Sequence, residues 1–507
     1  MSTLQDRIDA LPPERLAGMR RGIEKEGLRV LPSGELAITP HPPVLGASLT
    51  HPNITTDYSE SQMELITGAH RGVQDCLDEL TEVHQFALQA LRARGDEMLW
   101  ASSMPCLLPT DETIPLARFG GSNVGRAKSI YRMGLGFRYG RRMQTICGIH
   151  YNWSMPGVTS EQYFALIRNF RRHSFVLLYL FGASPALCRC FAQGRPHALR
   201  QLSDKTLYLP HATSLRMGRL GYQSDAQATL AVSYNSLEGY AASLQEALTR
   251  PYPAYEAVGV RNPGGDYNQL GTSLLQIENE FYGTIRPKRV IAPGERPLHA
   301  LRERGVEYVE VRLMDLNPFE PVGIDAPTMR LLDVFLLHCL LNDSPPDTPE
   351  EITELQHNQH LTAARGRESG LRLRRQGKTV LLSDWGAQLL DECIPLAARL
   401  DREHGNSDYS TALAAARALI DAPAQTPSAR VLAAMAGAHE QSFIAFTLAQ
   451  SQHANSALLD LPWSAAQQAR QTALAEASVA AKKAIEASDT LDFEEWRQHY
   501  MAASGLI

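Results

Sequence analysis

Polar side chains placed two residues apart inside strand-like patterns constrain the fold of this chain more than any other feature. Successive side chains of a strand point to opposite faces, so residues two apart share one face. The pairs are Glu24 with Glu26, His150 with Asn152, and Glu310 with Arg312, and Glu64 lies in a fourth stretch, residues 62–67. Carboxylates and an imidazole that converge on one sheet face repel unless cations join them. The spacing therefore predicts bound Mg²⁺ or Mn²⁺ and, with it, a phosphate substrate.

The Glu24-Lys-Glu26 triplet also has an ordinary interpretation, because such triplets are usually solvated strand edges. Leu28 and Val30 share the face of these two carboxylates, which indicates that the face is at least partly buried. Buried carboxylates need a partner, and this favours the functional interpretation.

The other two pairs carry weaker signals when each is taken alone. A single histidine such as His150 is more often an ordinary core or surface residue than a ligand, although Gly148 keeps its face small enough for close ligand approach. Glu310 and Arg312, predicted to share a face with Met314, also fit an in-strand ion pair. In the functional interpretation the carboxylate binds a metal and the guanidinium binds phosphoryl oxygens in pairs.

Length and charge limit the classes of protein. The chain has 507 residues, enough for about three or four domains or one large single-site enzyme. The formal net charge of −6 argues against a general nucleic-acid binder. The longest apolar stretch, residues 174–182, is too short to span a membrane. We therefore expect neither nucleic acid nor a membrane as a partner.

The cysteines indicate a reducing compartment. Seven of them are scattered along the chain, and the polar start lacks a secretory segment, so free thiols and a cytoplasmic location are expected. Cys188-Arg-Cys190 lacks a second pair at zinc-site spacing and is interpreted as structural.

The pattern along the chain predicts an α+β fold. Residues 71–96 form an amphipathic helix, because Val73, Leu77, Leu80, Val83 and Phe86 recur every three or four positions. We expect one large, mostly antiparallel sheet that carries the site on its concave face, with helices behind it. Residues 1–340 would form the catalytic region, and residues 341–507 a mainly helical region packed on it.

The standard nucleotide-binding motifs are absent from the sequence. Residues 120–127 nearly copy the phosphate-binding loop, but Arg126-Ala127 replaces the Lys-[Ser/Thr] that holds phosphate and magnesium. If ATP binds, metals and arginines must hold its phosphates.

Many separated motifs, in order over residues 20–340, resemble the proteobacterial type of glutamate–cysteine ligase. The stretches that carry the resemblance are Gly22–Val30, Leu49–Asp57, Met104–Cys106, Phe181–Ala186, Ala212–Arg216, Gln276–Glu280, Ile285–Arg289 and Val306–Phe319. The resemblance implies a glutamine-synthetase-like fold in which a curved sheet forms a funnel. It also implies ATP-dependent joining of the γ-carboxyl of L-glutamate to the amine of L-cysteine through γ-glutamyl phosphate, the first step of glutathione biosynthesis.

The resemblance also implies roles for individual residues. It places a metal that bridges the ATP phosphates, and a second metal near the reacting carboxylate. The first set of ligands is Glu24, His150 and Glu310, and the second is Glu26, Asp57 and Glu64. Arg312 would stabilise the transferred phosphoryl group. The remaining residues would bind substrate or phosphate: Tyr58, Tyr131, Tyr222 and Tyr282 around cysteine, and Arg132 and Arg216 as anchors.

Alternative functions remain open at this point. A related carboxylate–amine ligase would join glutamate to another amine, such as ammonia, which needs no carboxylate anchor. A bifunctional glutathione-making enzyme would need a second ATP-binding domain, and residues 340–507 are too short and too helical for one. A protein that had lost catalysis would have broken metal ligands, whereas all six positions hold ligand-capable residues. We expect small-molecule substrates and a monomer.

Overall fold

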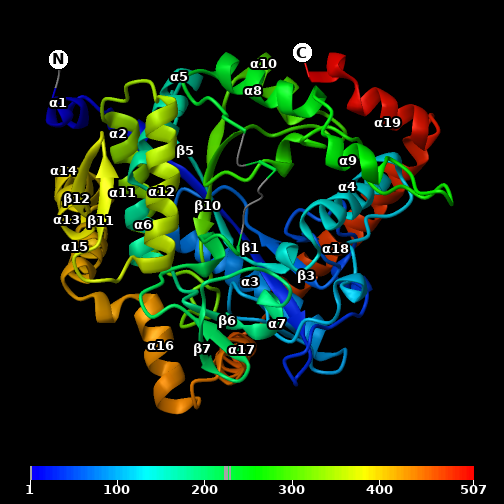
Figure 1. Cartoon of the computed structure of the whole chain (residues 1–507), viewed down its shortest axis with the longest axis horizontal. Coiled ribbons are helices and arrows are strands. Elements are labelled where there is room, and N and C mark those ends of the chain that lie inside the picture. The colour runs from blue at the N-terminus through cyan, green and yellow to red at the C-terminus, as the bar shows by residue number, and fades with distance from the viewer. Residues whose placement is uncertain (1–2, 222–225, 228–229, 507) are drawn as a thin grey trace.

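The centre of the molecule is an antiparallel sheet, seen in Figure 1. The computed structural model describes residues 3–221, 226–227 and 230–506. Within this part of the chain the sheet has seven strands in the order β2-β3-β1-β5-β10-β9, and β4 pairs with the end of β1. Its strands are β1 (Arg20–Val30), β2 (Ile54–Thr56), β3 (Gln62–Ile66), β4 (Met98–Leu99), β5 (Ile149–Ser154), β9 (Ile285–Lys288) and β10 (Tyr308–Met314). The mostly antiparallel sheet expected from the sequence is present.

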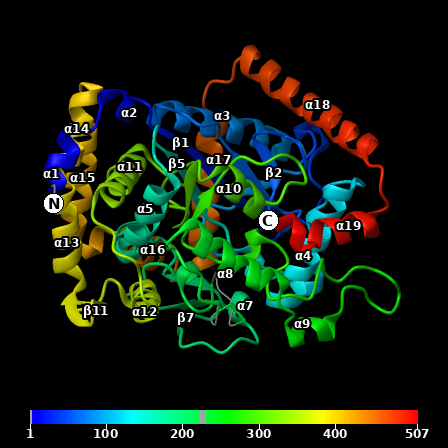
Figure 2. The same ribbon diagram turned by 90° about the horizontal axis from the view of Figure 1, so that it is seen from above.

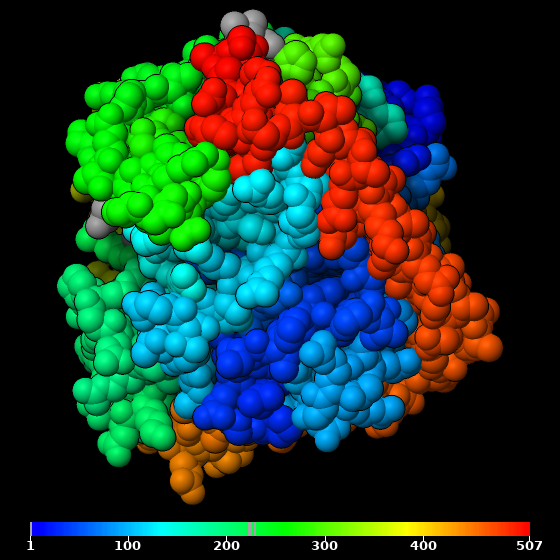
Figure 3. Space-filling view, turned by 90° about the vertical axis from the view of Figure 1, so that its right-hand side faces the viewer, coloured from blue at the N-terminus to red at the C-terminus, as the bar shows by residue number. Residues whose placement is uncertain are grey.

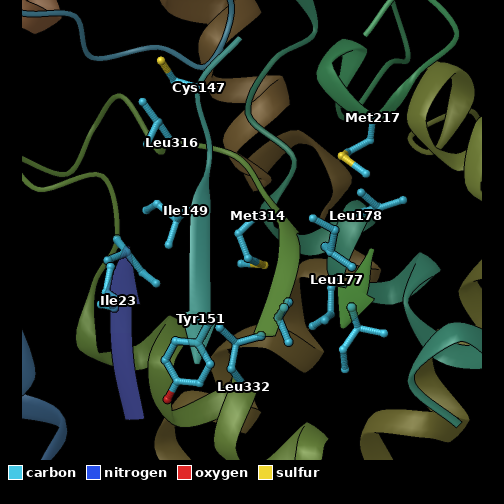
Figure 4. Packing of buried hydrophobic residues seen from close by; sticks show 14 of the residues in the cluster. Ile23, Cys147, Ile149, Tyr151, Leu177, Leu178, Met217, Met314, Leu316 and Leu332 are labelled. Carbon is cyan, nitrogen blue, oxygen red and sulfur yellow. The ribbon is translucent and has the colours of Figure 1, made fainter. Parts of the chain in front are cut away.

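The two faces of the sheet differ as the alternation predicts. Glu24 lies opposite His150 in the β1–β5 register, and Glu26 lies opposite Glu64 in the β1–β3 register. Ile23 and Ile149, which directly precede Glu24 and His150, point into the hydrophobic core on the other face. Figure 4 shows this apolar face.

Helices cover the apolar face of the sheet. Leu177 and Leu178 of α6 and Leu332 of α11 belong to the same buried cluster as Tyr151 of β5, and Leu332 lies beside Tyr151 (Figure 4). The covering helices are α3 (Val73–Arg92), α5 (Ser160–His173), α6 (Phe175–Phe181) and α11 (Ala326–Leu341). The five apolar positions that predicted α3 are all buried, which confirms that helix.

The end of β10 departs from simple alternation. Val311 pairs with Tyr151, but Met314 pairs with Ile149, so two residues of β10 oppose one residue of β5. This β-bulge turns Met314 into the apolar core beside Ile149 (Figure 4). The prediction that Met314 shares the face of Glu310 was therefore wrong, because strict period-two counting fails across a bulge.

Several helices lie in the left half of the molecule as Figure 1 shows it, the half that contains the N-terminus. They include the early helices and the first part of the C-terminal region, which contains a short hairpin. The elements are α1 (Leu4–Asp9), α2 (Pro13–Ala17), α12 (Pro349–Arg365), β11 (Arg372–Arg375), β12 (Lys378–Leu381), α13 (Leu382–Glu392), α14 (Ile394–His404), α15 (Asp408–Asp421) and α16 (Pro427–Ala438). Figure 2 shows α13, α14 and α15 together at one end of the molecule, opposite α18 and α19.

The last helices return to the first half of the chain. α17 (Phe443–Leu459) packs on α3 and β4, α18 (Ala465–Ser488) packs on α3, and α19 (Phe493–Met501) packs on α4 (Asn123–Tyr139). Figure 3 shows this orange and red segment running across the blue and cyan surface of the N-terminal part. None of the described helices is long and apolar enough to cross a membrane.

The remaining strands and α-helices of the described residues complete the fold. They are a small three-stranded sheet in the order β6-β8-β7, and four α-helices. Their bounds are β6 (Ala186–Cys188), β7 (Arg200–Ser203), β8 (Thr206–Tyr208), α7 (Arg189–Ala192), α8 (Leu237–Thr249), α9 (Pro253–Val258) and α10 (Pro297–Arg304).

Candidate active site

A cavity of about 690 Å³ lies on the polar face of the sheet. This volume is in the range of small-molecule sites. Side chains from strands β1, β3, β5, β9 and β10, from the loop after β2, and from α4, α18 and α19 line it. Its floor carries what we call the carboxylate cluster, which consists of Glu24, Glu26, Asp57, Glu64 and Glu310.

His150 connects three members of the carboxylate cluster. Its Nδ1 lies 3.1 Å from Glu24 Oε2 and 3.8 Å from Glu310 Oε1, and its Nε2 lies 3.4 Å from Glu26 Oε1. Asn152 Nδ2 donates to Glu24 Oε1 at 2.9 Å, so His150 and Asn152 of β5 orient the same carboxylate. The pairs identified by spacing therefore meet in one place.

The second half of the cluster concentrates negative charge. Glu26 and Glu64 face each other across β1 and β3, where like charges destabilise a sheet. Burial, reinforced by Glu24, Asp57 and Glu26, raises the pKa of Glu64 well above its usual range. Burial raises the pKa of Glu26 as well, with Asp57 adding to the effect. These carboxylates would ionise more readily with a cation between them.

Glu310 is held in the opposite state. Burial alone would raise its pKa, but Lys288, Arg312 and His150 outweigh burial and hold the pKa well below its usual range. Lys288 Nζ lies 3.4 Å and Arg312 Nη1 lies 3.1 Å from Glu310 Oε1. Glu310 is therefore an ionised carboxylate available to bind a cation.

The donor set fits a hard divalent cation. One ligand atom from each of Glu24, His150 and Glu310 can be chosen so that all three lie within 4.8 Å of one another. Glu310 Oε2 is buried, and no hydrogen-bond donor within the described residues reaches it. Carboxylate oxygens with one imidazole suit Mg²⁺ or Mn²⁺.

Arg132 and three of the four predicted tyrosines also reach the cavity. Arg132 comes from α4, where its Nη1 donates to Lys128 O at 3.0 Å and its guanidinium lies 4.5 Å from the centre of the Phe119 ring. Tyr58, Tyr131 and Tyr282 line the same cavity.

The tyrosines differ in their surroundings. The Tyr58 hydroxyl is buried and has no hydrogen-bond partner among the described residues, whereas Tyr282 Oη accepts from Gln144 Nε2 at 2.7 Å. Burial raises the pKa of Tyr58, so its phenol is neutral. Tyr222, the fourth predicted tyrosine, lies outside the residues that the structure describes.

Arg216 lies behind the cavity wall and is not among the residues that line it. Its side chain is 2 % exposed, and its Nη2 donates to Arg312 O at 2.9 Å. A Cβ at position 148 would clash with the Arg216 guanidinium, which explains Gly148. The space that Gly148 leaves is thus filled by Arg216 and not by a ligand.

Sequence reasoning missed several residues that line the cavity. Arg286 and Lys288 lie two apart on β9, with Arg286 opposite Glu310. The spacing rule that identified Glu310 and Arg312 would have found this pair too. Trp496 and Tyr500 of α19 line the cavity as well, and no local pattern in the C-terminal region pointed to them.

Comparison with known proteins places the chain in a family. The family model described as glutamate–cysteine ligase matches residues 9–362. A glutamate–cysteine ligase of Alcanivorax borkumensis is 45% identical, covering 99% of each chain. One of Pseudomonas entomophila is 48% identical, covering 95% of this chain and 93% of that one.

Solved structures agree with the sequence relatives. The glutamate–cysteine ligase of Francisella tularensis, in complex with AMP, matches with a TM-score of 0.91 and 36% identity, over 97% of this chain and 99% of that one. A bifunctional glutathione synthetase of Pasteurella multocida matches with a TM-score of 0.72 and 23% identity, over 93% of this chain and 57% of that one, and this shows the fold.

The fold and the matches define an enzyme of the ligase class. The chain belongs to the glutamate–cysteine ligase family. The predicted glutamine-synthetase-like fold, with its curved antiparallel sheet, is confirmed by the match to the Francisella tularensis structure.

Proposed function

We propose that the carboxylate cluster is where this ligase uses ATP to activate the γ-carboxylate of L-glutamate for attack by the amine of L-cysteine. The products are γ-glutamylcysteine, ADP and phosphate, and the reaction is the first step of glutathione biosynthesis. The observation that carries the proposal is the meeting of five carboxylates and His150 with Arg312 and Lys288 in one cavity. The AMP bound in the Francisella tularensis structure supports a nucleotide in the same fold.

Two sets of residues would hold divalent cations, Mg²⁺ or Mn²⁺. Glu24, His150 and Glu310 form the first set, and Glu26, Asp57 and Glu64 form the second. When bound there, the cations would supply positive charge that neutralises the phosphates and the carboxylates around them. Asn152, bonded to Glu24, keeps the first set oriented.

The protein's own cations would stabilise the transferred group. A carboxylate is a poor electrophile, so its oxygen first attacks the γ-phosphorus of ATP, giving γ-glutamyl phosphate. Phosphoryl transfer of this kind depends on positioning and electrostatics. Arg312 is held beside Glu310 at the cluster, and its planar guanidinium suits phosphoryl oxygens. Arg132, which lies in α4, would contact either the same phosphoryl group or the carboxylates of the substrates. Arg216, bonded to the Arg312 carbonyl, would position Arg312.

The tyrosines would hold cysteine. Tyr282 and Tyr131 line the cavity, and the Tyr58 hydroxyl has spare hydrogen-bonding capacity. Tyr222 retains the same role as a prediction from the family resemblance. The enzyme would act as a monomer on small molecules in the cytoplasm, with residues 1–340 as the catalytic region and residues 341–507 packed on it.

Product analysis tests this proposal against a ligase for another amine. Purified protein would be given ATP, Mg²⁺ and glutamate, with either cysteine or ammonia. We expect an amide at the γ-carboxyl carbon of glutamate, formed with cysteine at far lower concentration than with ammonia. An α-linked dipeptide, or equal activity with ammonia, would contradict the assignment of cysteine as substrate.

A further inference from the structure

Three cysteines from two distant parts of the chain meet outside the active-site cavity. Cys106 lies in the loop after β4, Cys188 ends β6, and Cys190 lies in α7. All three are free thiols, and none of them lines the cavity. We call Cys106, Cys188 and Cys190 the thiol cluster. The sequence suggested a structural role for Cys188-Arg-Cys190, because nothing in it showed that Cys106 joins them.

The sulfur atoms of Cys188 and Cys190 lie 2.9 Å apart, with the Cys190 thiol as the donor. A disulfide bond is ~2.05 Å long, so a small movement would close it. Hydrogen bonds from the thiols of Cys106 and Cys190 hold the pKa of Cys188 well below its usual range. The Cys188 sulfur is therefore the thiolate of the cluster.

The backbone around the cluster supports negative charge on sulfur. The backbone N–H groups of Leu107 and Cys190 contribute to lowering the pKa of Cys188, and that of Leu108 acts in the same direction on the pKa of Cys190. Leu107 adopts a φ of 46°, in the left-handed region that a leucine rarely occupies. Such strain persists where the surroundings hold it, and here it accompanies the N–H contact to Cys188.

Access differs among the three thiols. Cys188 and Cys106 are each 3 % exposed, whereas Cys190 is half-buried. A small reagent therefore reaches Cys190 first, with the Cys188 thiolate already in contact behind it. Cys190 is therefore the sulfur that reacts with the reagent, and Cys188 is the sulfur that resolves the resulting mixed disulfide.

We propose that the thiol cluster is a thiol–disulfide exchange site that reacts with small-molecule disulfides and closes a Cys188–Cys190 disulfide. The site is separate from the ligase reaction and does not depend on it.

The exchange balances in two steps. Hydroxide removes the Cys190 proton, and the Cys190 thiolate attacks the disulfide RSSR. This gives a Cys190–S–S–R mixed disulfide and RS⁻, which is protonated by water. The Cys188 thiolate then attacks the Cys190 sulfur and expels a second RS⁻, which is protonated by solvent. The two cysteines are oxidised by two electrons, and RSSR is reduced to two thiols.

The experiment uses the full-length reduced protein with bis(2-hydroxyethyl) disulfide as the probe. After free thiols are blocked, peptide mapping by mass spectrometry locates the oxidised residues. We expect a Cys188–Cys190 disulfide in the unaltered protein and a lasting mixed disulfide at Cys190 in Cys188→Ser. Cys106→Ala removes one hydrogen bond from the Cys188 thiolate, so disulfide closure should slow several-fold at neutral pH.

Cys393→Ser serves as the matched control, because Cys393 is fully buried elsewhere and should leave the exchange unchanged. Mapping of the unaltered chain keeps the test valid if a variant fails to fold. Two results would overturn the proposal: three thiols that stay reduced while the probe modifies other cysteines, or stoichiometric zinc released from the cluster on denaturation.

Discussion

Glu310 shows at the residue scale why the cavity favours cations. Its side chain is 1 % exposed, yet Lys288 and Arg312 keep it ionised. A carboxylate buried in this state requires positive partners on every side. One of its oxygens, Oε2, has no hydrogen-bond donor within the described residues. A bound cation would supply the partner that Glu310 Oε2 lacks among the described residues.

Glu310→Gln should therefore reduce turnover while leaving the fold intact. The amide keeps the shape but removes the charge that would bind the cation. A metal is worth several kcal/mol of transition-state stabilisation, and each ~1.4 kcal/mol is tenfold in rate, so we expect a loss of ~100-fold or more. Steady-state turnover at saturating Mg²⁺ measures the effect.

Glu307→Gln is the matched control, because Glu307 precedes the same strand and its side chain is 47 % exposed. It should retain nearly full turnover. Equal losses in both variants, or full activity of Glu310→Gln, would remove Glu310 from the cation site.

His51 links a buried residue to the acid stability of the protein. Its Nδ1 accepts hydrogen bonds from the backbone N–H groups of Asn53 at 3.1 Å and Ile54 at 3.0 Å. Burial lowers the pKa of His51 to about 4. Protonation would place a proton on the accepting Nδ1, which breaks both hydrogen bonds, and would also leave a positive charge in the interior; both effects disfavour the folded state.

The sign of the resulting pH dependence follows from linkage. The folded pKa lies below the unfolded value of ~6.5. The stability that this difference provides is therefore complete above pH ~6.5 and is lost as pH falls toward 4. Urea unfolding at pH 7.5 and pH 5 should show that the free energy of unfolding falls less between these two pH values in His51→Asn than in the unaltered protein. The exposed His357→Asn should behave like the unaltered protein, and the same loss in all three would contradict this role of His51.

Residue roles were only partly predictable from the sequence. Period-two spacing brought Glu24, Glu26, His150 and Glu310 to one face, because a strand imposes that geometry locally. The environment of Arg216 could not be predicted this way. Arg216 lies in a short 3-10 helix (Leu215–Met217) far along the chain from Gly148, and its guanidinium fills the space beside Gly148.

At the scale of elements, the bulge in β10 lets one strand present Arg312 to the cavity and bury both of the next two residues in the core. Arg312 lines the cavity, whereas Leu313 and Met314 are buried in the core on the opposite face. Without the extra residue, Met314 would point toward the cavity. A sequence pattern cannot place such a bulge, because the signal lies in the pairing with β5.

The helix α19 is a second element whose role depends on tertiary structure. Trp496 and Tyr500 stack with ring centres 4.9 Å apart, and both line the cavity. Arg296 ties this helix to the cavity wall, since its Nη1 donates to Tyr500 O at 2.7 Å and its guanidinium pairs with Glu278 at 2.9 Å. The C-terminal region therefore completes the cavity.

Trp496→Ala should raise the Michaelis constant for ATP, because a flat aromatic surface suits a purine base while the cations hold the phosphates. A loss of ~1.4 kcal/mol of binding free energy corresponds to a tenfold increase in this constant. Initial rates at varied ATP give this constant. Gln498→Ala, on the exposed side of α19, should leave it unchanged. Unaltered constants for ATP and both amino acids in Trp496→Ala would separate α19 from substrate binding.

At the scale of the whole molecule, the architecture was the most predictable part. The composition and the alternation of polar and apolar residues indicated an antiparallel sheet with helices behind it, and the sheet β2-β3-β1-β5-β10-β9 has this form. The return of α18 and α19 to the cavity was not predictable, because their contacts join residues more than three hundred positions apart, such as Asn123 N–H with Asp489.

ADP release by the purified protein tests the central claim most directly. It would be measured with ATP and Mg²⁺ and with glutamate alone, cysteine alone, or both, and repeated with excess chelator. Ligation coupled to ATP predicts rapid ADP release with both amino acids, little with cysteine alone, and none in chelator. Equal release without glutamate, or full activity in excess chelator, would contradict a cation-dependent glutamate–cysteine ligase at the carboxylate cluster.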